Sequence, residues 1–536
     1  MTFSYKRFLN LPKPSKEDFR GDRERILDAL NMPDASMTME ALRSLYPLTA
    51  QADYAVTVTL CPGDRGTDVI RVEPGDTTHR LLGLALDIGS TTLEMELVDM
   101  LTGLVLRNVG CVNSQVSFGL NILDRILAVK ENRENLEALR LLVTGDINRL
   151  IEEVTAGLAE PEEISALTVG GNTTMIHFFL GCDPWLVFQN PYAPVFFDPG
   201  IHSARELGLK LCCNVFCFPA KANYLGGDIT AGLLLTDLDT GEKPSIFLDI
   251  GTNGELCLGC REFLLMGAGA AGPALEGFGS RYGMRAEPGA IRHMHIADDG
   301  SIQLDVIGGG EPVGICGTGI FDLVAQCYLR GIIFGDGTVN REQKDFTTEV
   351  WDEDAERMVP AVVYYEKADK KLYFTEPDIR EFIRCKAAAH TMVATLLEYC
   401  GLGLDDIDHI YLAGGFGTHI DLESAVTVGI YPDVDRKKMF CWAIHPLPGQ
   451  KSSCWMQGRW RGCGIFWRAA SICTFRRWSV SRRTWWRRSL FPTRTVVSIP
   501  VSNGIRCKNS LENSIFPLYR RKGFGYNALI YAIYEK

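Results

Sequence analysis

A short turn of Asp, Gly and hydroxyl residues occurs twice in this chain, with the residue types that bind phosphate and a metal ion. The first copy is Leu86–Thr92 (LDIGSTT) and the second is Leu248–Gly254 (LDIGTNG). Glycine after the aspartate lets the backbone approach a ligand closely, and nearby amides and hydroxyls can donate to phosphate oxygens. The aspartate can hold a metal ion. One such turn is typical of an ordinary hairpin, but two near-identical copies indicate duplicated domains that share a nucleotide.

The residues around each turn have the pattern of a β-hairpin. Apolar runs at Leu81–Leu86 and Ile246–Leu248 lead into the turns, and alternating stretches at Leu93–Val98 and Glu255–Leu258 follow them. Alternation with a period of two residues is typical of a strand. The sequence therefore predicts that each turn joins two antiparallel strands.

A glycine pair followed by Asn and Thr stands at a third junction. Gly170–Met175 (GGNTTM) follows a predicted strand, Ala166–Val169, and opens a predicted helix, Met175–Leu180. These residues can cap the helix, and the free amides at a helix start can also bind an anion. Both interpretations remain open. His177, inside this helix, is expected to pack or cap rather than bind a ligand.

Gly226–Asp228 opens a further predicted helix, Ile229–Leu235, just before the second Asp-Gly turn. The helix dipole stabilises an acid at this position, which is a purely structural role. Because Asp228 is close in sequence to Asp249, holding a metal ion or positioning water is the alternative.

Two later glycine-rich stretches differ in character. Gly267–Gly279 is too rich in glycine for a helix and too apolar for a linker, so we expect a buried loop beside a ligand. Gly314–Gly319 opens a predicted helix, Ile320–Leu329. It lacks the acid that a dinucleotide fingerprint places on the ribose, which excludes a dinucleotide-binding fold here.

The last strong motif is Ile410–Thr418 (IYLAGGFGT), a predicted strand that ends in Gly-Gly-Phe-Gly. Without Cβ atoms in the way, a flat purine can lie on bare backbone. A tight turn into the predicted helix Leu422–Val428 is an equally good interpretation of the motif alone.

The remaining elements are weaker. Residues 340–372 are charged and expected to be peripheral. The other predicted elements are helices at Phe19–Leu30, Met39–Leu45 and Glu376–Glu398, the last of them ended by Gly401, and a strand at Tyr54–Leu60.

Length and composition bound the class of protein. At 536 residues the chain exceeds what one core usually supports. No apolar run is long enough to span a bilayer, and the N-terminus lacks the apolar core of a signal peptide, so we expect a cytoplasmic protein that does not bind membranes. The 17 cysteines are expected to be reduced, and their groups at Cys212–Cys217 and Cys257–Cys260 to be incidental or buried thiols. They match neither zinc nor ferredoxin-type iron–sulfur spacing.

The charge is unevenly distributed. Trp442–Lys536 carries 17 Lys and Arg against two acids, a balance of +15, which leaves −26 for residues 1–441. This tail also holds seven of the nine tryptophans. It has no apolar period, so instead of a nucleic-acid-binding surface we predict a disordered, out-of-frame tail. A shifted reading frame near Met439–Cys441 permits a glycine turn and an amphipathic helix.

The motifs together resemble the superfamily of acetate and sugar kinases, heat-shock proteins and actin. Within it, the match is closer to the reductive activators of corrinoid proteins. The resembling residues are Asp87–Thr92, Gly119–Ile126, Gly171–Met175, Gly226–Asp228, Asp249–Glu255, Gly272–Glu276, Gly314–Gly319 and Ala413–Thr418, with a linker-like Pro14–Asp18 and Asp22–Leu27. The resemblance covers roughly residues 8–440.

The resemblance implies an α/β fold in which two ribonuclease-H-like ATPase halves follow a small α+β linker module. The expected domains are 1–80 (linker), 81–245 (first half), 246–440 (second half, with the adenosine motif) and 441–536 (tail). ATP and Mg²⁺ would bind between the halves, and ATP hydrolysis would drive reduction of a Co(II) corrinoid protein to Co(I) in support of a corrinoid-dependent methyltransferase system.

The resemblance also implies roles for individual residues. Asp87 and Asp249 would hold Mg²⁺, and Asp228 would orient the attacking water as the third catalytic residue. The residues that would contact the nucleotide are Gly89, Ser90, Thr91, Thr92, Gly251, Thr252, Asn253, Gly254, Gly317, Thr318, Gly319, Gly414, Gly415, Phe416 and Gly417.

The chain departs from the family pattern in two respects. Asn121 stands where the family usually has an acid. The iron–sulfur spacing that the family normally carries is not found, so the expected electron donor is another polypeptide, such as a ferredoxin, unless the encoded protein is incomplete. The expected partners are a corrinoid protein and this donor, with no nucleic acid; a homodimer is compatible with the sequence.

Two other classes of function compete. A small-molecule kinase of the same superfamily would share every phosphate motif, although the linker match counts against it. A non-enzymatic, actin-like nucleotide switch is disfavoured because nothing in the sequence indicates polymer contacts.

Overall fold

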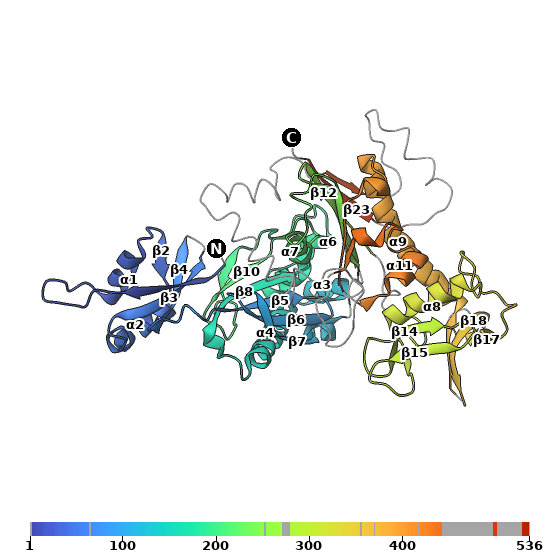
Figure 1. The fold of residues 1–536 in the computed structure, drawn as a ribbon, viewed down its shortest axis with the longest axis horizontal. Coiled ribbons are helices and arrows are strands. Elements are labelled where there is room, and N and C mark those ends of the chain that lie inside the picture. Colours follow the sequence, from blue (N-terminus) through green and yellow to red (C-terminus); the bar gives the residue numbers. More distant parts are fainter. Residues whose placement is uncertain are drawn as a thin grey trace. The chain divides into compact units, whose positions relative to one another are not determined.

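The computed structural model describes residues 3–63, 66–119, 121–250, 253–270, 279–353, 356–368, 370–414, 419–441, 497–500 and 528–534. These residues form two compact units, which meet in the sequence at Thr236 and Asp237. The second unit includes the two short tail segments. Each unit is considered by itself (Figure 1).

The first unit begins with a small α+β module. Its sheet has the order β1-β3-β4-β2, formed by Tyr5–Asn10, Ala55–Pro62, Thr67–Pro74 and Ala35–Met37. The helices α1 (Asp22–Leu30) and α2 (Met39–Gln51) contribute Ile26, Leu30 and Leu45 to its core. Both helices and the strand β3 were predicted, with shifted ends.

A larger sheet follows, in the order β7-β6-β5-β8-β10-β9. Its strands are β5 (Leu82–Ile88), β6 (Thr92–Asp99), β7 (Leu104–Val112), β8 (Ile164–Gly171), β9 (Ile201–Ser203) and β10 (Asn214–Cys217). The helices are α3 (Ile122–Glu131), α4 (Glu134–Thr155), α5 (Thr173–Phe179), α6 (Trp185–Phe188) and α7 (Gly227–Leu233). Leu139, Val143 and Ile147 of α4 are buried in the core of this sheet.

The second unit repeats this topology. Its main sheet has the order β21-β20-β11-β12-β13-β23-β22. The strands are β11 (Ser245–Ile250), β12 (Asn253–Cys260), β13 (Phe263–Ala270), β20 (Ile410–Ala413), β21 (Met439–Cys441), β22 (Val497–Pro500) and β23 (Ala528–Tyr534). In both units a three-stranded antiparallel meander lies beside parallel strands added later in the chain. The predicted duplication is therefore present in the backbone.

Among the described residues, three α-helices and two small sheets complete the second unit. The helices are α8 (Gly317–Leu329), α9 (Glu376–Cys400) and α11 (Leu422–Val428). One small sheet contains β14 (Ala290–Ile296), β15 (Ile302–Val306) and β16 (Gly314–Ile315), and the other contains β17 (Thr347–Asp352), β18 (Arg357–Lys367) and β19 (Lys370–Thr375). Gly401 ends α9, as predicted, and adopts a left-handed conformation there.

Three sequence-based expectations are wrong in part. Residues 340–372 are not simply peripheral, because β18 and β19 bury Val362, Tyr364 and Leu372 in the core. Gly267–Ala270 is the end of strand β13 rather than loop, and its small residues let α9 pack against the strand; residues 271–278 lie outside the described part. In the tail, β23 pairs with β13, so this segment and β22 are strand rather than disordered.

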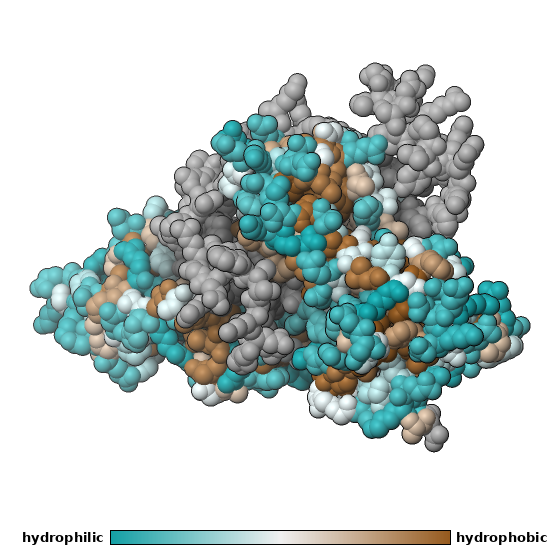
Figure 2. Space-filling view, turned by 45° about the vertical axis from the view of Figure 1, so that its right-hand side comes forward, coloured by the Kyte–Doolittle hydropathy of each residue, from teal (hydrophilic) through white to brown (hydrophobic). Residues whose placement is uncertain are grey.

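On the face that Figure 2 shows, the described residues form a mostly hydrophilic surface with hydrophobic residues in separate areas. Among the described helices, none is long and apolar enough to cross a membrane.

Glu96 in β6 makes the stability of the first unit depend on pH. Its side chain is 7% exposed, and burial, followed by the nearby charge of Glu94, raises its pKa to about 7. The folded state therefore keeps a proton that the unfolded state loses near the ordinary glutamate pKa. Stability falls as pH rises between these two values and stays low above the higher one.

We expect Glu96→Gln to stabilise the protein at pH 8 by about 3 kcal/mol or less, the worth of the pKa shift. The gain should largely vanish at pH 5. Urea midpoints of the wild-type and variant chains at the two pH values measure it. Glu131→Gln, at an exposed glutamate of the same unit, serves as the control; a wild-type-like pH dependence for Glu96→Gln would contradict the assignment.

Candidate functional site

The first Asp-Gly turn lies at the edge of the first unit's sheet. β5 and β6 form the predicted antiparallel hairpin, with Asp87 opposite Glu94. β8 runs parallel to β5 on its other side, and Asp87 pairs there with Gly170. Since the carboxyl ends of parallel strands meet at one edge, the Asp87 turn and the Gly170–Met175 turn are neighbours.

Asn172 caps helix α5 at this edge. Its Oδ1 accepts a hydrogen bond from the Met175 amide at 2.9 Å, so the capping role is confirmed. His177 packs, as expected: its Nδ1 lies 2.6 Å from the Thr173 carbonyl oxygen and its ring stacks on Phe196 with centroids 4.0 Å apart. Burial lowers the pKa of His177, so the ring is a neutral packing group.

Asp228 is brought to the same edge by the start of α7. A Cβ on Gly226 would lie only 2.4 Å from the Cα of Asn172, which places the two turns in direct backbone contact. Asp228 is partly buried, and its Oδ1 accepts from the Ile229 amide at 2.8 Å. Burial raises its pKa to about 6. A carboxyl oxygen of Asp228 can accept a hydrogen bond from water.

The second Asp-Gly turn joins a different partner in the second unit. β11 and β12 form the predicted hairpin, and β20 lies parallel to β11 with Ala413 beside Asp249. The next residue, Gly414, has a φ of +80°, and a Cβ there would lie 2.3 Å from Asp249 Oδ1. The start of the predicted adenosine motif thus touches the predicted metal ligand.

The described residues cover only part of these second-unit motifs. Asn253 and Gly254 begin β12. Gly251, Thr252, Gly415, Phe416 and Gly417 lie outside the described residues, and their roles stay predictions.

Gly317–Gly319 forms the first turn of α8, beside β14. The Thr318 hydroxyl donates to the Arg292 carbonyl at 2.7 Å, and a Cβ on Gly319 would meet the Ile291 carbonyl oxygen. The contacts found here are those of helix packing.

Three residues near the two sites were not identified from the sequence. Asn113 and Arg125 lie behind the Asp87 turn and hydrogen-bond to its carbonyl oxygens. Tyr431 is 2% exposed; burial, followed by Cys441 and Asp249, raises the pKa of its phenol, which remains neutral. Arg125 could have been found from the sequence, because it is an arginine on the buried face of the amphipathic helix predicted within Gly119–Ile126.

Other candidate groups fit a ligand less well. His409 Nδ1 lies 2.9 Å from Asp237 Oδ2, near Asp408, so this set resembles a metal site but already contains a hydrogen-bonded pair. Burial raises the pKa values of the Cys213 and Cys217 thiols to about 12, as expected for inert buried cysteines.

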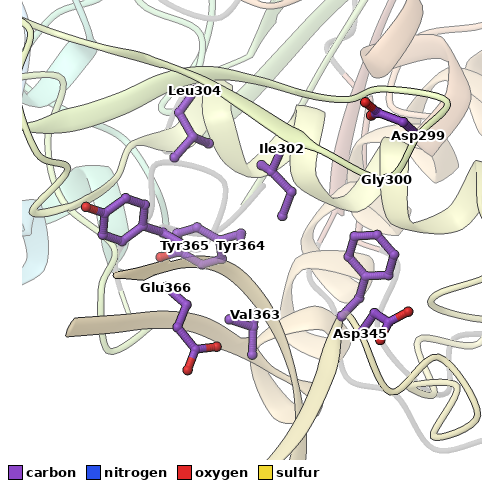
Figure 3. A pocket seen from close by; sticks show the side chains of 10 residues that line it. Asp299, Gly300, Ile302, Leu304, Asp345, Val363, Tyr364, Tyr365 and Glu366 are labelled. Carbon is purple, nitrogen blue, oxygen red and sulfur yellow. The ribbon is translucent and has the colours of Figure 1, made fainter. Parts of the chain in front are cut away.

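A cavity of about 560 Å³ opens between β15 and β18 in the second unit (Figure 3). The carboxylates of Asp299, Asp345 and Glu366 lie around it. None of the predicted nucleotide residues lines it, and its acids would repel phosphate. It is therefore not the nucleotide site.

Comparison with known families assigns nearly the whole described chain to three consecutive regions. Residues 3–79 match the RACo linker region, residues 82–241 the RACo middle region, and residues 243–443 the C-terminal domain of RACo, the ASKHA domain.

Individual relatives agree with this assignment. The chain is 29% identical over 428 residues to the corrinoid activation enzyme RamQ of Eubacterium limosum, covering 77% of this chain and 70% of that protein. It is 25% identical over 392 residues to the [Co(II) methylated amine-specific corrinoid protein] reductase of Methanosarcina barkeri, covering 67% of each. A solved structure of a reductive activator for corrinoid,iron-sulfur protein matches with a TM-score of 0.75 and 32% identity, over 91% of this chain and 75% of that one.

Proposed function

Since this chain belongs to the RACo family, we propose that it reduces the inactive Co(II) form of a corrinoid protein to Co(I), in a reaction coupled to ATP hydrolysis. A separate low-potential donor, such as a ferredoxin, gives up one electron, which reduces Co(II) to Co(I), and ATP and water yield ADP and phosphate. The family assignment supports this function, as do the relatives named for corrinoid activation. The contact between Asp249 and Gly414, the residue that follows β20, is the observation in the structure that carries the nucleotide part of the proposal.

The two half-buried aspartates fit a hard divalent cation, because carboxylate oxygens are the ligands that Mg²⁺ prefers. We propose that Asp87 and Asp249 hold Mg²⁺, directly or through water. When bound, the ion neutralises charge on the phosphate oxygens. The bare backbone at Gly414 leaves room for the Asp249 carboxylate, whose Oδ1 would lie 2.3 Å from a Cβ at that position.

The other proposed roles follow from position. Ser90–Thr92 would bind phosphate oxygens through backbone amides and hydroxyls, and Gly414–Gly417 would hold adenosine. Asp228, located beside the Asn172 turn, would accept a hydrogen bond from the attacking water.

The test uses the full chain with ATP, Mg²⁺, a low-potential reductant and one of two Co(II) substrates. These are a corrinoid iron–sulfur protein and a methylated-amine corrinoid protein. We expect the Co(I) absorbance to appear with at least one substrate, only in the presence of hydrolysable ATP. A non-hydrolysable ATP analogue is the control.

Absence of Co(I) from both substrates, together with phosphorylation of a sugar or a carboxylic acid, would replace this function with that of a small-molecule kinase. Co(I) formation at the same rate with the non-hydrolysable analogue would remove the coupling to ATP hydrolysis.

A further inference from the structure

Two arginines of the first unit are almost completely buried, and they differ in how their charge is balanced. Arg25 is 1% exposed and forms an ion pair with Asp18, with 2.7 Å between Nη1 and Oδ2. Arg125 is 0% exposed, yet among the described residues it forms no direct ion pair, and the neighbouring Asp124 only partly offsets the effect of burial, which lowers the pKa of Arg125. A buried charge without a directly paired counter-charge is costly, so its retention calls for a reason.

The contacts of Arg125 converge on the first Asp-Gly turn. Its Nη2 donates to the Ser90 carbonyl oxygen at 2.6 Å and its Nε to the Gly119 carbonyl oxygen at 2.9 Å. Its Nη1 lies 3.6 Å from the Met175 sulfur, in the helix that Asn172 caps. One guanidinium therefore joins α3, the Asp87 turn and α5.

A second buried side chain holds the turn from the same side. Asn113 Nδ2 donates to the Gly89 carbonyl oxygen at 2.9 Å and lies 3.8 Å from the same Met175 sulfur. Two consecutive carbonyl groups of the turn, those of Gly89 and Ser90, are thus drawn toward the interior.

The direction of these two carbonyl groups determines the direction of the N–H groups that follow them. In a planar trans peptide the C=O and the following N–H point in opposite directions. Drawing the two carbonyl groups inward turns the N–H groups of Ser90 and Thr91 outward. Neither N–H donates to another described residue, and both residues are partly exposed. Two outward-facing amides in succession form an anion-binding concavity.

We propose that Arg125 is a positioning residue for phosphate binding, which holds the Ser90–Thr91 peptide with its N–H toward the polyphosphate. This inference rests on the proposed function. The charge of Arg125 polarises the Ser90–Thr91 peptide from behind, and that charge is compensated when an anion is bound in front. Arg125 itself does not touch the nucleotide.

The test is calorimetric titration of the full-length wild-type, Arg125→Met and Arg125→Lys chains with ATP, ADP and adenosine. Loss of a charge-assisted contact predicts that Arg125→Met weakens ATP and ADP binding about tenfold or more. Arg125→Lys, which keeps the charge and one donor, should lie in between. Adenosine has no phosphate, so its affinity should not change; a general loss of structure would weaken all three ligands alike.

Arg25→Met is the matched control, because it removes an equally buried arginine from the linker module and should leave all three affinities unchanged. Equal ATP affinity in wild type and Arg125→Met would overturn the role of Arg125, and so would a parallel loss for adenosine. Neither result depends on cobalt reduction. Failure to form Co(I) with normal nucleotide binding would remove the proposed function and leave this role intact.

Discussion

Asp249→Asn is expected to abolish ATP turnover while the chain stays folded. Asparagine keeps the volume of the side chain at the end of β11 but removes the negative charge that would hold Mg²⁺. A bound metal contributes several kcal/mol of charge stabilisation to phosphoryl transfer, so its loss corresponds to about a thousandfold in rate. Phosphate release measured under saturating ATP tests this, with circular dichroism to establish folding.

Asp405→Asn is the control for this substitution. Asp405 is an exposed aspartate in the short 3₁₀ helix Leu404–Asp406 of the same unit. Its variant carries the same change in net charge and should turn over ATP at the wild-type rate. Undiminished turnover by Asp249→Asn would refute the metal-holding role.

The two β-hairpins that contain Asp87 and Asp249 could be predicted from the sequence, because residues close together in the chain determine them. The alternation of apolar and polar residues can be recognised within a few consecutive positions, as in Leu93–Val98 and Glu255–Leu258. Both segments lie in the predicted hairpins. The helix Leu422–Val428 was predicted with its observed ends, since Asp421 caps its start and Gly429 its end. These locally favoured elements form in the folded protein because the tertiary packing is compatible with them.

Two other segments were predicted wrongly because their overall amino-acid composition differs from that of a typical buried strand. In β18 the charged residues Arg357, Glu366 and Lys367 stand at the two ends of the strand, whereas its middle carries apolar residues that are buried. The high average charge of residues 340–372 therefore led to the prediction that the whole segment is peripheral. Gly267–Ala270 looked like a loop, although small residues in a strand also let a helix pack closely on it.

The positions of Arg125 and Asn113 could not be predicted by any local pattern. Their contacts reach Gly89, Ser90 and Met175, which lie between 24 and 62 residues away in the sequence. The Gly119–Ile126 motif, which contains Arg125, can be recognised in the sequence. The carbonyl groups that bind Arg125 and Asn113 can be identified only from the folded arrangement of β5, α3 and α5. Similarly, the contact of Gly414 with Asp249 follows from the parallel register of β20 on β11.

That contact gives Gly414→Ala a large expected effect. The φ of +80° already disfavours a side chain, and the new Cβ would lie 2.3 Å from Asp249 Oδ1 and 3.2 Å from the Ile250 carbonyl oxygen. Either the turn or the carboxylate must move. Misplacing a catalytic group by about an ångström costs on the order of a hundredfold, so kcat/KM for ATP should fall by about that factor.

Gly401→Ala separates this displacement from backbone strain. Gly401 ends α9 in the same unit with a φ of +67°, and a Cβ there meets no atom within 4 Å. Both variants carry the left-handed strain of roughly 1–2 kcal/mol, so both should lower the unfolding midpoint. Only Gly414→Ala should lower kcat/KM, because only there does the added methyl group press on the aspartate. Equal kinetic losses in the two variants would mean that strain alone acts, and that the close approach of Gly414 to Asp249 has no catalytic purpose.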